Sequence, residues 1–206
     1  MTANIEKKSS AKSGWLIPTG LILLSVLPLI GGAHRLAVSF GFAQLTKDDL
    51  RFASATLLIS VHALSSLVYF MLGAFQFSPS LRARRLNWHR VAGRVLILCG
   101  LVSAISGIWM ALVLPPLFGD GKAITYVRLA VGSATILFIV KGFIAIRRRQ
   151  FDRHRAFMMR GYALAIGAGT QPFTFIPTLL IPAQYEELRY TIGLTAGWLL
   201  NMVVAE

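Results

Sequence analysis

Histidines and arginines are the residues of this 206-residue chain whose types and spacing best suit chemistry. His89 and His154 each follow an arginine-rich stretch, and each is followed directly by an arginine. Two histidines at matched depth on neighbouring helices are what axial ligation of a b-type haem requires, and nearby arginines can neutralise its propionates. The pattern predicts a candidate haem or ligand site formed by His89, His154, Arg90, Arg94, Arg155 and Arg160.

The same residues admit two other interpretations. Guanidinium groups match phosphate oxygens, so Arg90, Arg94, Arg155 and Arg160 would also suit the headgroup of an anionic lipid. In the plainer interpretation, the histidines meet lipid headgroups at the interface and the arginines only determine topology. The sequence leaves the three interpretations open.

A second group of polar residues lies inside apolar segments. The segment around His62 carries polar residues at helical spacing, and an ionisable residue within a membrane is a functional hypothesis by default. The alternative is a neutral imidazole that is hydrogen-bonded to a neighbouring helix. The candidate intramembrane polar site consists of His62, Tyr69, Gln76, Gln171 and Asn201.

Several enzyme classes find no support in the sequence. The chain has no Walker loop, dinucleotide fingerprint, nucleophile elbow or HExxH motif, so we predict neither a hydrolase nor a kinase and assign no catalytic residue. Cys99 is the only cysteine, which excludes an intrachain disulfide and a CxxC pair. No metal is expected beyond the iron of a haem.

The elements that must position these residues are transmembrane helices. The chain is 55% hydrophobic and 14% charged, whereas charged residues make up about 25% of soluble domains. We expect an all-α membrane protein with a bundle of six transmembrane helices, or five if the last segment does not cross. Residues 1–13 form a polar N-terminus, and residues 14–206 form a single domain. The expected spans are 14–33, 52–77, 95–114, 126–146, 157–181 and 190–206.

Two details of these spans are open. The first span is either retained or cleaved as a signal peptide, and its length favours retention. The fifth contains Pro172 and Pro177, which predict a kink.

The net charge of +13 is distributed as a topology signal. Lysine and arginine number three in the N-terminus, five in residues 80–94 and six in residues 147–160. Cytoplasmic loops retain such residues, so these segments should share the cytoplasmic side of a bacterial inner membrane. Because the positive charges lie between apolar spans, we expect no nucleic-acid partner.

Small residues and a short repeat describe the packing. Stripes at four-residue spacing predict close helix contacts at Ser103, Gly107 and Ala111, at Gly161, Ala165 and Gly169, and at Gly193 and Gly197. The His-Arg segments, 65 residues apart, suggest that spans two and three repeat as spans four and five in parallel orientation.

The sequence also resembles a known family. The segments Trp88-His89-Arg90 to Arg94 and His154-Arg155 to Arg160, with the ending Trp198 to Glu206, are similar to bacterial membrane proteins of the DUF2306 family over roughly residues 50–206. In that family an aromatic residue, usually tryptophan, follows the second His-Arg, where this chain has Phe157, and an arginine takes the place of Gln171. The resemblance implies a multi-pass inner-membrane protein and supplies no activity.

Three functions from different classes remain open. The first is a haem- or quinone-linked redox membrane protein, with haem b as the cofactor. The second is a carrier of small molecules or a lipid-interacting protein. The third is a scaffold that forms a homo-oligomer or joins a membrane complex.

Overall fold

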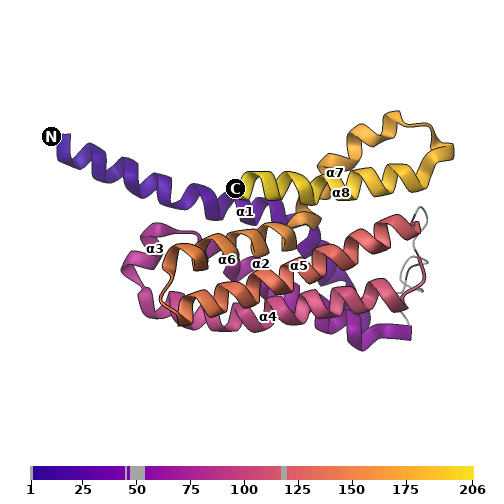
Figure 1. The fold of residues 1–206 in the computed structure, drawn as a ribbon, viewed down its shortest axis with the longest axis horizontal. Helices are drawn as coiled ribbons and strands as arrows, with labels where there is room; N and C mark the ends of the chain where they lie inside the picture. Colours follow the sequence, from indigo (N-terminus) through magenta and orange to yellow (C-terminus); the bar gives the residue numbers. More distant parts are fainter. Residues whose placement is uncertain (1, 45, 47–53, 117–119) are drawn as a thin grey trace.

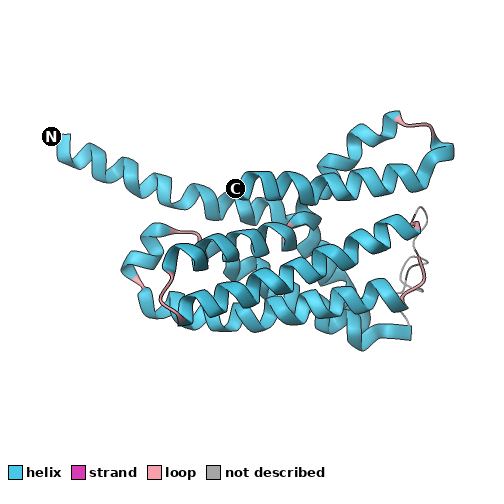
Figure 2. Ribbon diagram, viewed as in Figure 1, coloured by secondary structure: helices cyan, strands magenta, loops and turns pink. Residues whose placement is uncertain are grey.

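The structure, a computed structural model, describes residues 2–44, 46, 54–116 and 120–206. These residues form helices joined by short connections, and no strand occurs among them (Figure 2). The elements are α1 (Thr2–Ser39), α2 (Thr56–Gln76), α3 (Pro79–Arg84), α4 (Leu86–Val113), α5 (Lys122–Arg147), α6 (Phe151–Ala165), α7 (Gly167–Phe175), the 3₁₀ turns η2 (Ile176–Leu180) and η3 (Ala183–Tyr185), and α8 (Glu186–Ala205).

The helices form a bundle with a hairpin attached to it. In Figure 1, α2, α4, α5 and α6 run alongside one another, α1 crosses them, and α7 and α8 form the hairpin. The most extensive contacts join α5 to α6, α2 to α4, α1 to α2 and α7 to α8. The all-α fold class is therefore confirmed.

Length and hydropathy identify four candidate spans. They are Gly14–Ser39, Thr56–Gln76, Leu86–Val113 and Lys122–Arg147, and the bent pair α6 and α7 with η2 makes a fifth if it is one broken span and not a re-entrant loop. Of the six expected spans, the first four are confirmed as candidates and the fifth corresponds to the bent pair, whereas α8 is not among the candidates and the sixth span stays a prediction. Several helices are longer than predicted: α1 continues past residue 33 and α4 begins at Leu86 instead of residue 95. A helix continues through interfacial charged residues, where the hydropathy signal stops.

The fifth span bends at a different place from the one its prolines mark. The break lies between Ala165 and Gly167, with an angle of 49°. Pro172 has no N–H for the carbonyl of Ala168, and its ring crowds that carbonyl, so the strain falls on the turn that precedes the proline. The predicted kink is confirmed, and it lies at Ile166, six residues or more than one and a half turns before Pro172.

The basic segments meet at one end of the bundle. The N-terminal end of α1, the α3–α4 connection and the α5–α6 turn lie at the left of Figure 1. The predicted shared end is confirmed, and the side of the membrane on which it lies stays a prediction.

Aromatic rings and glycines form the core near this end. The buried cluster contains Tyr69, Phe70, Leu96, Ile139, Tyr162 and Ile166. Gly73 faces the Tyr162 ring so closely that a Cβ would overlap it.

The predicted small-residue contacts are found on three helices. Gly107 faces the His62 ring, Gly169 faces the carbonyl of Leu24 on α1, and Gly193 and Gly197 face Phe175 and Gln171 on α7. Close backbone approach therefore supports the α7–α8 hairpin and its contact with α1.

Candidate functional site

A cavity of about 470 Å³ lies between α1, α2, α4, α5, the end of α6 and the α7–α8 hairpin. Its α4 residues begin at Gly100, in the second half of a helix that starts at the basic end with Leu86, so the cavity is nearer the end opposite the basic turns. Its apolar wall includes Leu67, Phe70, Ile108 and Trp198. Its polar residues are Arg35, His62, Ser66, Tyr69, Ser103, Arg128, Thr135 and Gln171.

His62 is held by α4 through one ring nitrogen. Its Nδ1 lies 3.1 Å from the carbonyl oxygen of Ser103 and 3.0 Å from Oγ of Ser106. A carbonyl only accepts, so a neutral His62 donates from Nδ1 and carries its lone pair on Nε2. Nε2 makes no hydrogen bond to any residue that the structure describes. His62 therefore presents a hydrogen-bond acceptor to the cavity that it lines.

The α2–α4 packing fixes the position of this ring. Gly107 leaves room for it, since a Cβ there would lie 3.3 Å from Cε1 of His62. One turn further along α2, the hydroxyls of Ser66 and Ser103 lie 2.6 Å apart. His62 is six residues after Thr56, about 9 Å along the helix. The midpoint of α2 is only four residues further on, at Ser66, so His62 lies closer to the middle of the helix than to its end.

Tyr69 forms the inner end of the cavity. It lies two turns beyond His62 on the same helix, about 10 Å away along the axis. Its ring packs against that of Tyr162 with a centroid separation of 5.6 Å, and Gly100 leaves the space that the ring occupies. Tyr162 in turn donates its hydroxyl to the carbonyl of Phe70 at 3.0 Å.

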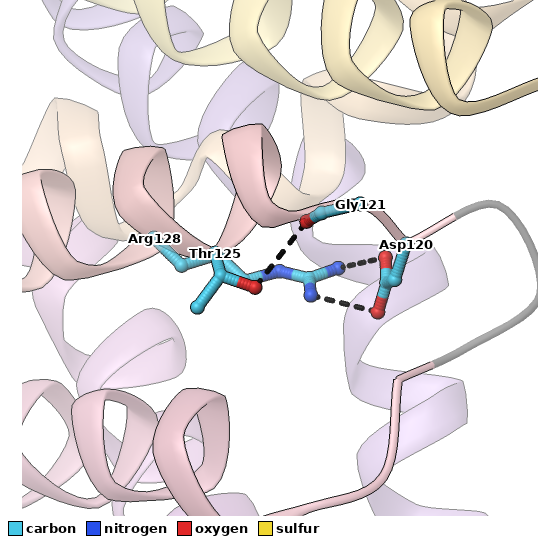
Figure 3. A network of polar contacts seen from close by, with 4 residues as sticks. All are labelled: Asp120, Gly121, Thr125 and Arg128. Atoms are coloured by element: carbon cyan, nitrogen blue, oxygen red, sulfur yellow. Dashed lines mark hydrogen bonds and ion pairs between the residues drawn. The ribbon is translucent and has the colours of Figure 1, made fainter.

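The cavity contains two arginines that the sequence did not assign to a site. Arg35 comes from the last turns of α1 and Arg128 from α5. Arg128 binds both carboxylate oxygens of Asp120, at 2.8 and 2.9 Å, just before the start of its own helix (Figure 3). The Asp120 side chain is only 2% exposed. The sequence does not reveal that the Asp120 side chain is buried, which is why this ion pair was not predicted.

The other polar residues predicted inside the membrane divide into two groups. Gln171 lines the cavity and donates to the carbonyl of Leu194 at 3.3 Å. Asn201 is not among the lining residues, because its amide donates to the Ala163 carbonyl at 3.1 Å and accepts from Thr170 at 2.8 Å. Gln76 is also outside the lining, and its Nε2 is buried without a hydrogen-bond partner among the described residues.

His89 and His154 lie at the basic end, each as the fourth residue of its helix. Nδ1 of His154 lies 2.9 Å from the carbonyl oxygen of Gly142, to which it donates, so Nε2 carries the lone pair. Nδ1 of His89 is buried and makes no hydrogen bond with the described part of the chain.

The arginines predicted around these histidines differ in their surroundings. Arg90, Arg94 and Arg155 are exposed. Arg160 instead forms a two-point ion pair with Glu206 at 2.5 and 2.6 Å, so its guanidinium already binds a carboxylate. Within the described residues, no group of three histidine, cysteine or acidic side chains gathers as a metal site would need.

A comparison with models of known protein families gives a match. A family model described as "Predicted membrane protein (DUF2306)" matches residues 59–206. Comparisons with the curated proteins and with the solved structures each found no match. The matched range contains α2 from Ile59 onward and every later helix, whereas α1 precedes it. Because the match covers more than half of the chain, the protein belongs to the DUF2306 family of predicted membrane proteins.

Proposed function

We propose that this membrane protein binds a small amphipathic molecule in its central cavity, as a carrier or a membrane-embedded binding protein. The cavity lined by His62 is the observation that supports the proposal. Its volume of about 470 Å³ falls in the range of small-molecule sites, which are mostly apolar with a few placed polar groups.

The hydrogen-bonding groups narrow the chemistry of the ligand. Nε2 of His62 accepts, so the matching ligand group is a hydroxyl or another donor. The apolar wall between His62 and Tyr69 suits a hydrocarbon or ring portion. A hydroxyl-bearing amphipathic molecule, for example a quinol, combines both features.

The experiment is a comparison of co-purified small molecules. Protein extracted with its native lipids would be assayed by mass spectrometry as wild type, His62→Ala and Ala111→Leu, which adds bulk to the lining. Gly20→Leu is the control, because no atom lies within 4 Å of a Cβ at that position. We expect an amphipathic compound in the wild type and in Gly20→Leu that is depleted in the two cavity variants. An identical set of compounds in all four proteins would contradict the proposal.

A redox function is the second candidate, supported by the placement of His89 and His154, each as the fourth residue of a helix that starts at the basic end. Each ring has a nitrogen, Nδ1 of His89 and Nε2 of His154, that makes no hydrogen bond with the described residues. In this function His89 and His154 would hold the iron of haem b, and Arg90, Arg94 and Arg155 would face its propionates. The haem would supply one-electron chemistry.

A visible absorption spectrum tests this second candidate. Purified protein would be measured oxidised and after dithionite reduction, as wild type, His89→Ala and His154→Ala. A reduced haem-b spectrum that either substitution abolishes is the expected result. A colourless wild type from cells with ample haem would eliminate the candidate and leave the cavity proposal unaffected.

A further inference from the structure

A groove of about 440 Å³ lies near the basic end, at the junction of α1, α2, α3 and α4. Its lining consists of Trp15, Leu72, Phe75, Leu81, Arg85 and Trp88. We propose that this groove is a binding site for one anionic phospholipid, with Arg85 on the phosphate and the aromatic rings against the glycerol and upper acyl chains. The site shares no residue with the central cavity, so it is independent of the proposed function.

Three aromatic rings from three helices form the wall of the groove. Phe75 packs edge-on against Trp15, with 6.3 Å between centroids, and against Trp88, with 6.4 Å. Tryptophan is enriched where the hydrocarbon core meets the headgroups, because its ring is apolar and its N–H is polar. Trp15 is 49% exposed, so it presents a large part of its ring to whatever occupies the groove.

Hydrogen bonds hold the two sides of the groove together. Ser78, which is buried, donates its hydroxyl to the carbonyl of Gly14, next to Trp15, at 3.1 Å. The same hydroxyl accepts from the N–H of Leu81 at 3.3 Å and so caps α3. Trp15 and Leu81 are therefore positioned by one serine, and the groove has a defined shape before a lipid enters it.

The positive charge at this end of the bundle favours the binding of an anion. Residues 79–94 contain five arginines and no acidic residue. Arg85 is exposed and makes no ion pair with any residue that the structure describes. A guanidinium beside an apolar groove matches a phosphate attached to hydrocarbon, and basic pockets between transmembrane helices recognise such headgroups. A free phosphate would satisfy Arg85 but would leave the aromatic wall uncovered.

Quenching of tryptophan fluorescence by brominated lipid tests the proposal. The protein would be reconstituted into phosphatidylcholine vesicles that contain dibrominated phosphatidylglycerol or dibrominated phosphatidylcholine at equal mole fractions. We expect stronger quenching by phosphatidylglycerol than by phosphatidylcholine. The preference of the protein for the anionic lipid should fall about fivefold in Arg85→Gln. Arg84→Gln removes the same charge from a residue outside the groove and should keep the preference.

Two further measurements locate the lipid and identify its source. Trp15→Phe with Trp88→Phe should abolish the preferential quenching, because the remaining tryptophans, Trp109 and Trp198, are outside the groove. Equal quenching by both lipids, or a preference unchanged in Arg85→Gln, would overturn the proposal. Loss of the quenching at millimolar inorganic phosphate, but not at the same ionic strength of sodium chloride, would also overturn it, since a free anion would then be preferred over the lipid.

Discussion

At the residue scale, similar positions on one helix face serve different purposes. His62 and Tyr69 both lie on the α2 face that lines the cavity, but His62 offers an acceptor nitrogen whereas the Tyr69 ring is part of the aromatic core. Gln76, on the same stripe, lies outside the cavity lining. Helical spacing alone does not distinguish the roles of these three residues, because each role depends on which helix packs against that part of α2.

Gly100→Ala should destabilise the protein. A Cβ at this position would lie 2.6 Å from the Tyr69 ring and 2.8 Å from Cδ1 of Ile139, so the core must shift. We expect a loss of about 1–3 kcal/mol, the usual cost of overpacking. Thermal unfolding in detergent measures it, and Gly20→Ala, which meets no atom within 4 Å, is the control. Equal unfolding temperatures for the two variants would contradict this packing.

Asp120→Asn tests the ion pair beside the cavity. The substitution removes the negative charge that faces the Arg128 fork, while Arg128 remains 27% exposed and partly solvated. We therefore expect a loss of only about 1–2 kcal/mol in the free energy of unfolding. Asp152→Asn, at an exposed carboxylate on α6, should leave the unfolding temperature unchanged. A similar loss from both substitutions would indicate a general charge effect.

At the element scale, the break between α6 and α7 determines how the last third of the chain packs. The 49° bend directs α7 away from α6, and α8 returns alongside α7 (Figure 1). Asn201 then ties α8 to both α6 and α7 through Ala163 and Thr170. Part of the cavity wall, including Gln171 and Trp198, comes from this hairpin.

Gly169→Ala should loosen the contact between α7 and α1. A Cβ at residue 169 would overlap the carbonyl of Leu24, and a backbone atom cannot move aside as a flexible side chain can. We expect a loss of at least about 2 kcal/mol in thermal unfolding. Gly31→Ala, on α1 with no atom within 4 Å, provides the matched control. An unchanged melting temperature would show that α1 does not pack tightly against the family-matched helices.

At the scale of the whole molecule, charge and helix direction together predict orientation. The basic turns share one end, and α8 runs back toward that end until Glu206 meets Arg160 (Figure 1). With the basic end in the cytoplasm, the residues between α4 and α5 would face outward. The predicted sixth crossing then depends on whether α8 reaches the cytoplasmic surface.

Reporter fusions test this orientation. We expect fluorescence from green fluorescent protein fused after Arg84, Arg149 and Glu206, and alkaline phosphatase activity from a fusion after Pro116. Phosphatase activity after Glu206 would support five crossings in place of six. Phosphatase activity from the fusion after Arg84 would show that the basic end faces away from the cytoplasm, opposite to the predicted orientation.

The sequence by itself determined the class of protein, its successive helices, the shared basic end and the family. These properties depend on the composition of each segment, because the length of an apolar segment and the charges that flank it can be read without knowing the rest of the fold. The tertiary structure decided which predicted polar residues meet. His62, Tyr69 and Gln171 line one cavity together with Arg35 and Arg128, whereas Asn201 lies outside it and donates to the carbonyl of Ala163. Those pairings depend on which helix faces are in contact. Closely packed glycines and the bend before Pro172 determine these contacts, and the spacing of residues along the sequence does not give the distances between helices.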